Sequence, residues 1–106
     1  MSVLFGVLAE EKERLSGAIA LYLSMADKLA RGSLRLKKQG KREYAYLAYR
    51  EKGKVYFDYV APVPSRKYED VKLRVRERNL LVKSIRQMRK DLVVIERTLK
   101  YASRSK

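Results

Sequence analysis

Tyrosines and cations interleaved in the middle of the chain are the residues best suited to chemistry. Between residues 32 and 61 the sequence alternates with a period of two, and aromatic rings follow Arg and Lys there. Side chains alternate between the two faces of a sheet, and in the three predicted strands one face carries a mixture of aromatic and cationic residues: Arg35, Lys37, Tyr44, Tyr46, Ala48, Arg50, Val55, Phe57 and Tyr59. Rings on such a face can stack on bases while cations contact phosphates. The pattern predicts a nucleic-acid-binding face.

Strand stability offers an alternative explanation of the same pattern. Tyrosine is common in strands, and cross-strand tyrosine pairs stabilise sheets. We expect the other face of the sheet to pack against the core, and it carries Leu34, Leu36, Ala45, Leu47, Tyr49, Tyr56 and Val60. A one-residue slip in either hairpin would exchange the two faces. Both explanations remain open from the sequence.

Two glycines divide this stretch into strands. Gln39-Gly40 and Lys52-Gly53 each place a glycine where a tight hairpin needs a positive φ. We predict strands at 33–38, 42–51 and 54–61, which form a three-stranded antiparallel meander. Two prolines between residues 61 and 65 predict an extended connector without regular pairing, and Ser65 is a good N-cap for the next helix.

The meander is flanked by two stretches with helical periodicity, at 3–31 and 66–103. Apolar residues at alternating three-and-four spacing form two seams: Phe5, Leu8, Leu15, Ile19, Tyr22, Ala26 and Leu29 on the first, and Leu81, Ile85, Met88, Leu92, Ile95, Leu99 and Ala102 on the second. We predict an α+β fold in one domain, 1–106, with the helices packed as an antiparallel coiled-coil-like pair. The second helix is the longer, so part of its seam stays uncovered in one protomer, and we expect a homodimer. Gly17 inside the first helix suggests that another backbone comes close there.

A basic stripe lies opposite the seam of the second helix. Its members are Lys72, Arg76, Lys83, Arg86, Lys90, Arg97, Lys100 and Arg104. Five of these positions, 76, 83, 90, 97 and 104, recur every seven residues, so the stripe keeps its angle to the seam. A helix face of this kind is often only solvated, but acidic residues are sparse along it. We therefore expect the stripe to contact phosphates.

Charge and composition narrow the partner class. The net charge is +14 over 106 residues. The first 31 residues hold four basic and four acidic residues, 32–60 hold eight and three, and 61–106 hold fourteen and five, so the excess belongs to the sheet and the second helix. This is the footprint of nucleic-acid binding, and also of attachment to anionic membranes. A Trp or Phe wedge beside a basic helix face, which would support the membrane alternative, is missing.

The residue inventory argues against an enzyme. The chain has no cysteine and no histidine, which excludes disulfides, thiol catalysis and histidine acid–base chemistry. Carboxylates do not repeat at metal-ligand spacing, and no glycine-rich phosphate loop occurs. We expect no catalysis, no metal and no cofactor.

The remaining expectations concern the protein's setting. No apolar run approaches the roughly 20 residues that span a bilayer, and the first residues lack the basic leader of a signal peptide, so we expect a cytoplasmic protein. Many Lys, Arg and Glu with few Asn and Gln resemble the composition of proteins from hot habitats.

Our leading interpretation is a small basic protein that binds DNA or RNA with weak or no sequence specificity. The alternative is an interaction, inhibitor or adaptor module that binds an acidic protein through the seam or the Tyr-rich face.

The central run also carries a resemblance. Its residues are Gly32-Ser33-Leu34, Lys38, Gly40-Lys41, Tyr44, Tyr46-Leu47, Tyr49-Arg50-Glu51, Gly53-Lys54-Val55 and Tyr59. This run resembles a pattern found in a family of short prokaryotic proteins with a helix, a Tyr-rich three-stranded sheet and a second helix. The resemblance implies that layout but no settled activity, and therefore no functional residue.

Overall fold

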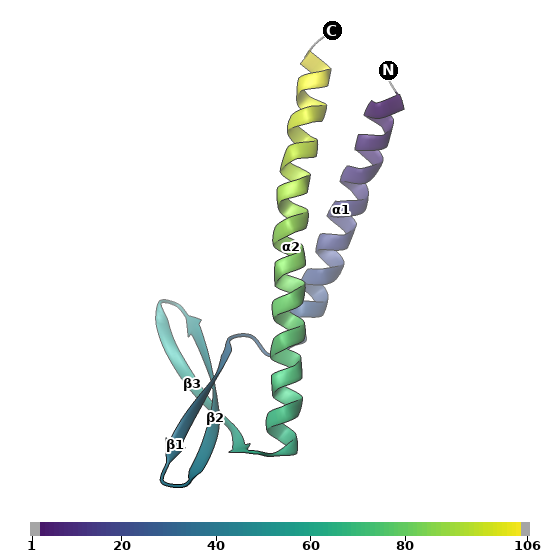
Figure 1. Cartoon of the computed structure of the whole chain (residues 1–106). Coiled ribbons are helices and arrows are strands. Elements are labelled where there is room, and N and C mark those ends of the chain that lie inside the picture. Colours follow the sequence, from purple (N-terminus) through teal and green to yellow (C-terminus); the bar gives the residue numbers. More distant parts are fainter. Residues whose placement is uncertain (1–2, 105–106) are drawn as a thin grey trace. The chain divides into compact units, whose positions relative to one another are not determined.

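The computed structural model describes residues 3–104 and contains five elements (Figure 1). In chain order they are α1 (Val3–Asp27), β1 (Ser33–Gln39), β2 (Arg42–Glu51), β3 (Lys54–Val63) and α2 (Arg66–Arg104). The predicted α+β content and the order of the elements are confirmed. The elements belong to two compact units: α1 up to Ala26 with α2 from Leu81, and residues 27–80 with the sheet and the first turns of α2.

The sheet is an antiparallel meander in the order β1-β2-β3. Each hairpin has a two-residue loop, because Gln39 pairs with Arg42 and Glu51 pairs with Lys54. Lys52 (φ 51°) and Gly53 (φ 80°) form the second loop, and two positive φ angles are typical of a type I′ turn. The first loop is Gly40-Lys41, one residue later than predicted, with φ 64° at Gly40. The short loops fix the register and thus the predicted sorting of side chains into two faces.

A β-bulge interrupts the pairing of β2 with β3. Tyr46 pairs with Tyr59 while Ala45 pairs with Ala61, which leaves Val60 as the extra residue. The bulge lets two consecutive residues, Val60 and Ala61, both be buried. The strand then continues to Val63, so the prediction of an unpaired connector from residue 61 was wrong. Proline is tolerated within β3 because β3 is an edge strand and its residues need not all donate to a neighbour.

The core of the sheet unit lies on the face predicted to be apolar. Ala45, Val60 and Ala61 are its buried residues, and partly buried side chains pack around them: Leu34, Leu47, Val63, Tyr68 and Val71. Tyr68 and Val71 come from the first turns of α2, which therefore cover this face. As predicted, Ser65 caps the helix, and its Oγ accepts a hydrogen bond of 3.2 Å from the backbone N–H of Tyr68.

This cover is incomplete, and two predicted core residues are exposed. Leu36 is 51% exposed and Tyr56 is 41% exposed. Both lie on the same face as Ala45, but the cluster that contains Tyr68 and Val71 forms around Ala45 and the β3 bulge and does not include them. The alternation of the strands was predicted correctly, whereas the extent of burial was not.

The first helix ends earlier than the sequence suggested. α1 stops at Asp27 rather than at residue 31, and Gly32 (φ 104°) instead serves the entry into β1. A Cβ atom at Gly32 would lie 2.3 Å from the carbonyl oxygen of Ala48 in β2, so only glycine fits. Arg31 next to it contacts Glu51 and Tyr49. These contacts join the segment between α1 and β1 to the sheet.

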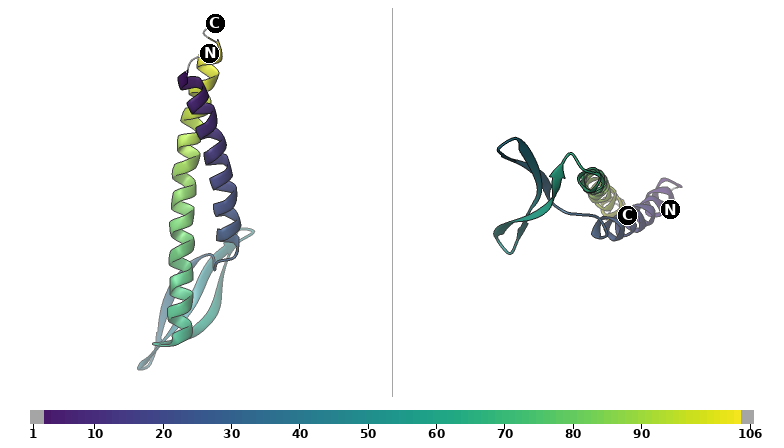
Figure 2. Two further views of the ribbon diagram at one scale, coloured as in Figure 1. Left: turned by 90° about the vertical axis from the view of Figure 1, so that its right-hand side faces the viewer. Right: turned by 90° about the horizontal axis from the view of Figure 1, so that it is seen from below.

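In the helical unit, α1 and the second half of α2 run side by side in opposite directions (Figures 1 and 2). Leu15, Ile19 and Ala26 of α1 and Ile85 of α2 are buried, and all four belong to the predicted seams. The prediction of a close backbone contact at Gly17 was wrong, because a Cβ there would meet no atom within 4 Å. No helix formed by residues 3–104 is long and apolar enough to cross a membrane.

Candidate nucleic-acid interface

The strand register separates the charges of the sheet. Alternation places on one face, here called the Tyr/Arg face, the side chains of Arg35, Lys37, Arg42, Tyr44, Tyr46, Ala48, Arg50, Val55, Phe57 and Tyr59. Four of these residues are cationic and none is acidic. The acidic residues of the strands, Glu43, Glu51 and Asp58, all fall on the opposite face. Although the strands contain both basic and acidic residues, all charged side chains of the Tyr/Arg face are basic.

The Tyr/Arg face is open to solvent. Because α2 packs against the opposite face, the aromatic rings here remain accessible: Phe57 is 62% exposed and Tyr59 is 55% exposed. Tyr44 and Tyr46 are half-buried, and Arg35, Lys37, Arg42 and Arg50 are exposed. A group of exposed rings, unlike a single exposed apolar residue, marks a surface suited to binding.

The tyrosines on this face support one another. The Tyr59 ring lies 5.6 Å from the Tyr46 ring, centroid to centroid, at 68°, which is an edge-to-face contact. Its distance to the Tyr44 ring is 6.3 Å, at 51°. Contacts of this kind restrict the rings, so Tyr59 presents an exposed surface that is already partly ordered.

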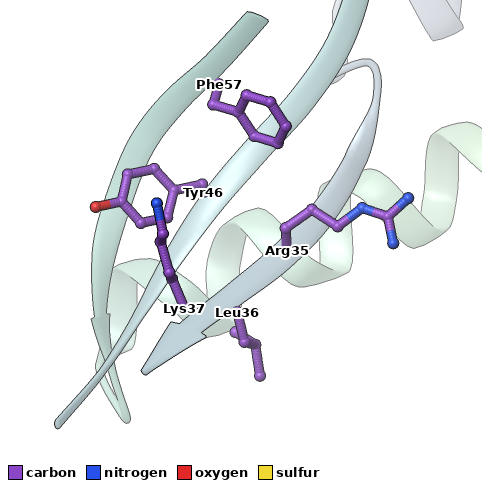
Figure 3. Close-up of a pocket in the computed structure, with 5 residues that line it drawn as sticks. All are labelled: Arg35, Leu36, Lys37, Tyr46 and Phe57. Atoms are coloured by element: carbon purple, nitrogen blue, oxygen red, sulfur yellow. The ribbon is translucent and has the colours of Figure 1, made fainter. Parts of the chain in front are cut away.

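A hollow of about 350 Å³ lies next to this cluster, lined by Arg35, Leu36, Lys37, Tyr46 and Phe57. Figure 3 shows Lys37 reaching toward Tyr46, whereas Leu36 points away from both. The Nζ atom of Lys37 lies 6.0 Å from the centroid of the Tyr46 ring. The hollow thus has an aromatic wall and cations at its rim.

Within residues 3–104, the cations of the Tyr/Arg face have no acidic partner. Among the described residues, the ion pairs are Arg14 with Glu11 on α1 and Arg31 with Glu51. Neither includes Arg35, Lys37, Arg42 or Arg50. Their donors are therefore available to an anionic ligand.

Residues on the opposite face, in contrast, bind one another. The Tyr49 and Tyr56 rings stack at 5.6 Å and 19°, and the Arg31 guanidinium lies 5.5 Å from the Tyr49 ring. Arg31 also approaches Glu51, with 3.4 Å between Nη2 and Oε1. Hydrogen bonding to Asp58, together with partial desolvation, raises the pKa of Tyr49 above its usual value of 10.0. These contacts stabilise the fold, and they engage Glu51 and Asp58 away from the Tyr/Arg face.

The predicted stripe on α2 is a second cationic surface. Arg76, Lys83, Arg86, Lys90 and Arg97 are exposed, and within the described part of the chain none pairs with a carboxylate. Arg76 belongs to the sheet unit and the other four to the helical unit. Lys72 is half-buried, with Nζ 5.7 Å from the Tyr68 ring centroid. The side chain of Arg104 lies outside the described part.

Sequence reasoning missed one cation of the Tyr/Arg face. Arg42 has the same parity as Tyr44 and Tyr46 and pairs with Gln39, so it belongs to the Tyr/Arg face. Counting the alternation back to the first residue of β2 would have found it. Within residues 3–104, no cluster of three or more acidic side chains is arranged to hold a metal ion.

Comparison of the chain with protein-family models, with curated proteins and with solved structures finds no significant match. The resemblance to the family of short prokaryotic proteins stays a prediction. The interface is therefore interpreted from its own geometry.

Proposed function

We propose that this protein is a small basic nucleic-acid-binding protein and that the Tyr/Arg face is its main binding surface. One observation carries the proposal: the sheet has exposed rings and cations without an ion-pair partner among residues 3–104 on one open face, and all its acidic residues on the other. Strand stability accounts for the cross-strand tyrosine pairs, but it does not account for this separation of charge.

The chemistry of the face fits a polyanion with flat bases. Arg35, Lys37, Arg42 and Arg50 can contact phosphates, and such contacts position a nucleic acid without reading its sequence. Exposed rings stack on any base, because every base has a π face. We therefore propose binding with weak or no sequence specificity.

The basic stripe on α2 supports the same function. Its exposed cations can neutralise further phosphates, whether on the same nucleic acid or on another. The helical unit carries Lys83, Arg86, Lys90 and Arg97 on one helix, so the stripe is a surface in its own right.

We also propose that the helical unit packs as a coiled coil and associates with a second copy. The packed seam leaves a further set of apolar residues exposed on α1: Leu4, Val7, Leu21 and Met25. On α2, positions 80, 87, 94 and 101 recur every seven residues and carry no cation, and Val94 is 61% exposed. A face without net positive charge is where two highly basic chains can meet with least repulsion.

Dimer formation is tested by sedimentation equilibrium of the parent and of a Leu21→Glu, Val94→Glu variant. We expect a concentration-dependent dimer for the parent and a monomer for the variant. A parent that remains monomeric at about 100 µM, a concentration well above the micromolar dissociation constants of ordinary specific interfaces, contradicts this part of the proposal.

The binding function is tested by fluorescence anisotropy with a labelled random single strand and a labelled duplex, over a series of salt concentrations. For four phosphate contacts on a single strand, the slope of log K against log salt should be about −2.8. Polyglutamate of matched length is the control competitor. Weak binding at low salt, or displacement by polyglutamate as effective as by nucleic acid, would favour the acidic-protein alternative.

A further inference from the structure

We infer that the ligand of the Tyr/Arg face is a single-stranded nucleic acid, with one unpaired base seated in the hollow beside Phe57. This inference rests on the proposed function and specifies its substrate class. Phe57 and Tyr46 form the aromatic wall of the hollow, and Arg35 and Lys37 lie at its rim (Figure 3).

The register explains why this hollow exists. Phe57 pairs with Ala48 of β2, and Ala48 pairs with Ser33 of β1, so the row across the sheet contains one large ring and two small side chains. In the next row Arg35, Tyr46 and Tyr59 stand side by side and are all large. Because the small side chains of Ala48 and Ser33 lie beside the larger ones of the next row, a space is left next to the Phe57 ring.

A base in this space must be unpaired. Within a duplex, the faces of each base are covered by its neighbours, so a side chain on a flat sheet cannot stack on them. Phe57 has no hydroxyl group and is 62% exposed, which leaves stacking as the main contribution its ring can make to a ligand. The ring therefore favours single strands over duplexes.

The two cations at the rim are placed for the backbone of the same strand. Arg35 and Lys37 are two residues apart on β1 and lie on the same face, roughly 6.6 Å apart along the strand. This spacing is comparable to that of consecutive phosphates in an extended single strand. An extended strand that follows β1 can place a phosphate at each cation and the base between them over the hollow.

The test uses single strands of DNA and of RNA that contain 2-aminopurine, a base whose fluorescence reports stacking, together with a duplex of the same sequence. The variants are Phe57→Leu and, as a matched control on the opposite face, Tyr56→Leu. We expect Phe57→Leu to weaken single-strand binding about 5- to 150-fold, the equivalent of ~1–3 kcal/mol per stacked base, and to remove the fluorescence change. Duplex binding should stay the same for both variants.

A second variant separates loss of the ring from loss of the fold. Phe57→Tyr keeps a ring in place and should retain both the affinity and the fluorescence change. Thermal melts followed by circular dichroism show whether each variant is folded. If Phe57→Tyr loses single-strand binding to the same degree as Phe57→Leu while both remain folded, stacking at this position is contradicted.

The outcomes distinguish the inference from the proposed function. If the parent binds duplex as tightly as single strand and Phe57→Leu changes neither, the single-strand inference is overturned and nucleic-acid binding stands. If the parent binds none of the probes, the proposed function itself fails. A preference for DNA or for RNA is compatible with the inference, because both present an unpaired base between phosphates.

Discussion

Removing two cations from the Tyr/Arg face should lower the salt dependence of binding by a calculable amount. Arg35 and Lys37 are exposed, have no acidic partner among the described residues, and lie at the rim of the hollow. If each contacts one phosphate, the double variant Arg35→Gln, Lys37→Gln loses two contacts, and the slope for a single strand becomes about 1.4 less steep. Between 50 and 200 mM salt, the parent should then lose about sevenfold more affinity than the variant.

The chain offers a matched control for this experiment. Lys38 and Lys54 lie on the opposite face of the same sheet, and both are exposed. The variant Lys38→Gln, Lys54→Gln therefore loses the same net charge from the opposite face of the sheet. Its salt slope, measured by the same anisotropy titration, should remain close to that of the parent. Equal slopes for the two double variants would refute the reasoning, because binding would then depend on total charge and not on one face.

Other predictions concern stability and ionisation. Gly32→Ala should destabilise the protein by ~2 kcal/mol or more in urea unfolding, because it combines a positive φ with a backbone clash. Gly17→Ala, where the added Cβ meets nothing, should instead stabilise it by about 1 kcal/mol. Ser65→Ala should cost ~1 kcal/mol through loss of the N-cap, measured in the same way. NMR titration should show Tyr49 ionising above pH 10.0, and Asp58→Asn should lower its pKa.

The raised pKa of Tyr49 means that ionisation of this residue at high pH destabilises the folded state. The folded state holds the phenolic proton more tightly than the unfolded state, whose pKa is close to 10.0. This contribution is fully present below about pH 10 and is lost as the pH rises through the folded pKa. Asp58→Asn should therefore unfold more easily than the parent at neutral pH, and the difference should shrink as the pH rises through the folded pKa of Tyr49. Equal stability of the two proteins at neutral pH, measured by urea unfolding, would contradict this role of Asp58.

Much of the sheet followed from local signals in the sequence. Gly40 and Gly53 adopt a positive φ, which residues with a side chain avoid. These two glycines therefore indicate the positions of the hairpin turns in the sequence. Two-residue loops then determine the register, and alternation sorts the side chains into faces. For this reason the composition of the Tyr/Arg face, apart from Arg42, follows from the sequence pattern alone. Arg42 was missed only because the alternation was not followed to the end of the strand.

Other features depended on contacts between segments that are distant in sequence. Leu36 and Tyr56 have the parity of core residues but are exposed, because the core forms around Ala45 and the β3 bulge. α1 ends at Asp27, before the predicted boundary, and Arg31 in the segment that follows contacts Tyr49 and Glu51 of the sheet. Helix and strand propensities depend on residues close in sequence, so they do not predict such long-range contacts.

The sequence by itself determined the order of the elements, the presence of two tight turns, the alternation along the strands and the grouping of rings with cations. Each of these follows from backbone sterics at glycine or from a period of two, which act over a few residues. The tertiary structure decided which face of the sheet is covered. That choice depends on where Tyr68 and Val71 of α2 pack, and they pack against Ala45 and the bulge at Val60. Because the first turns of α2 cover the apolar face, the rings and cations of the Tyr/Arg face remain exposed to solvent.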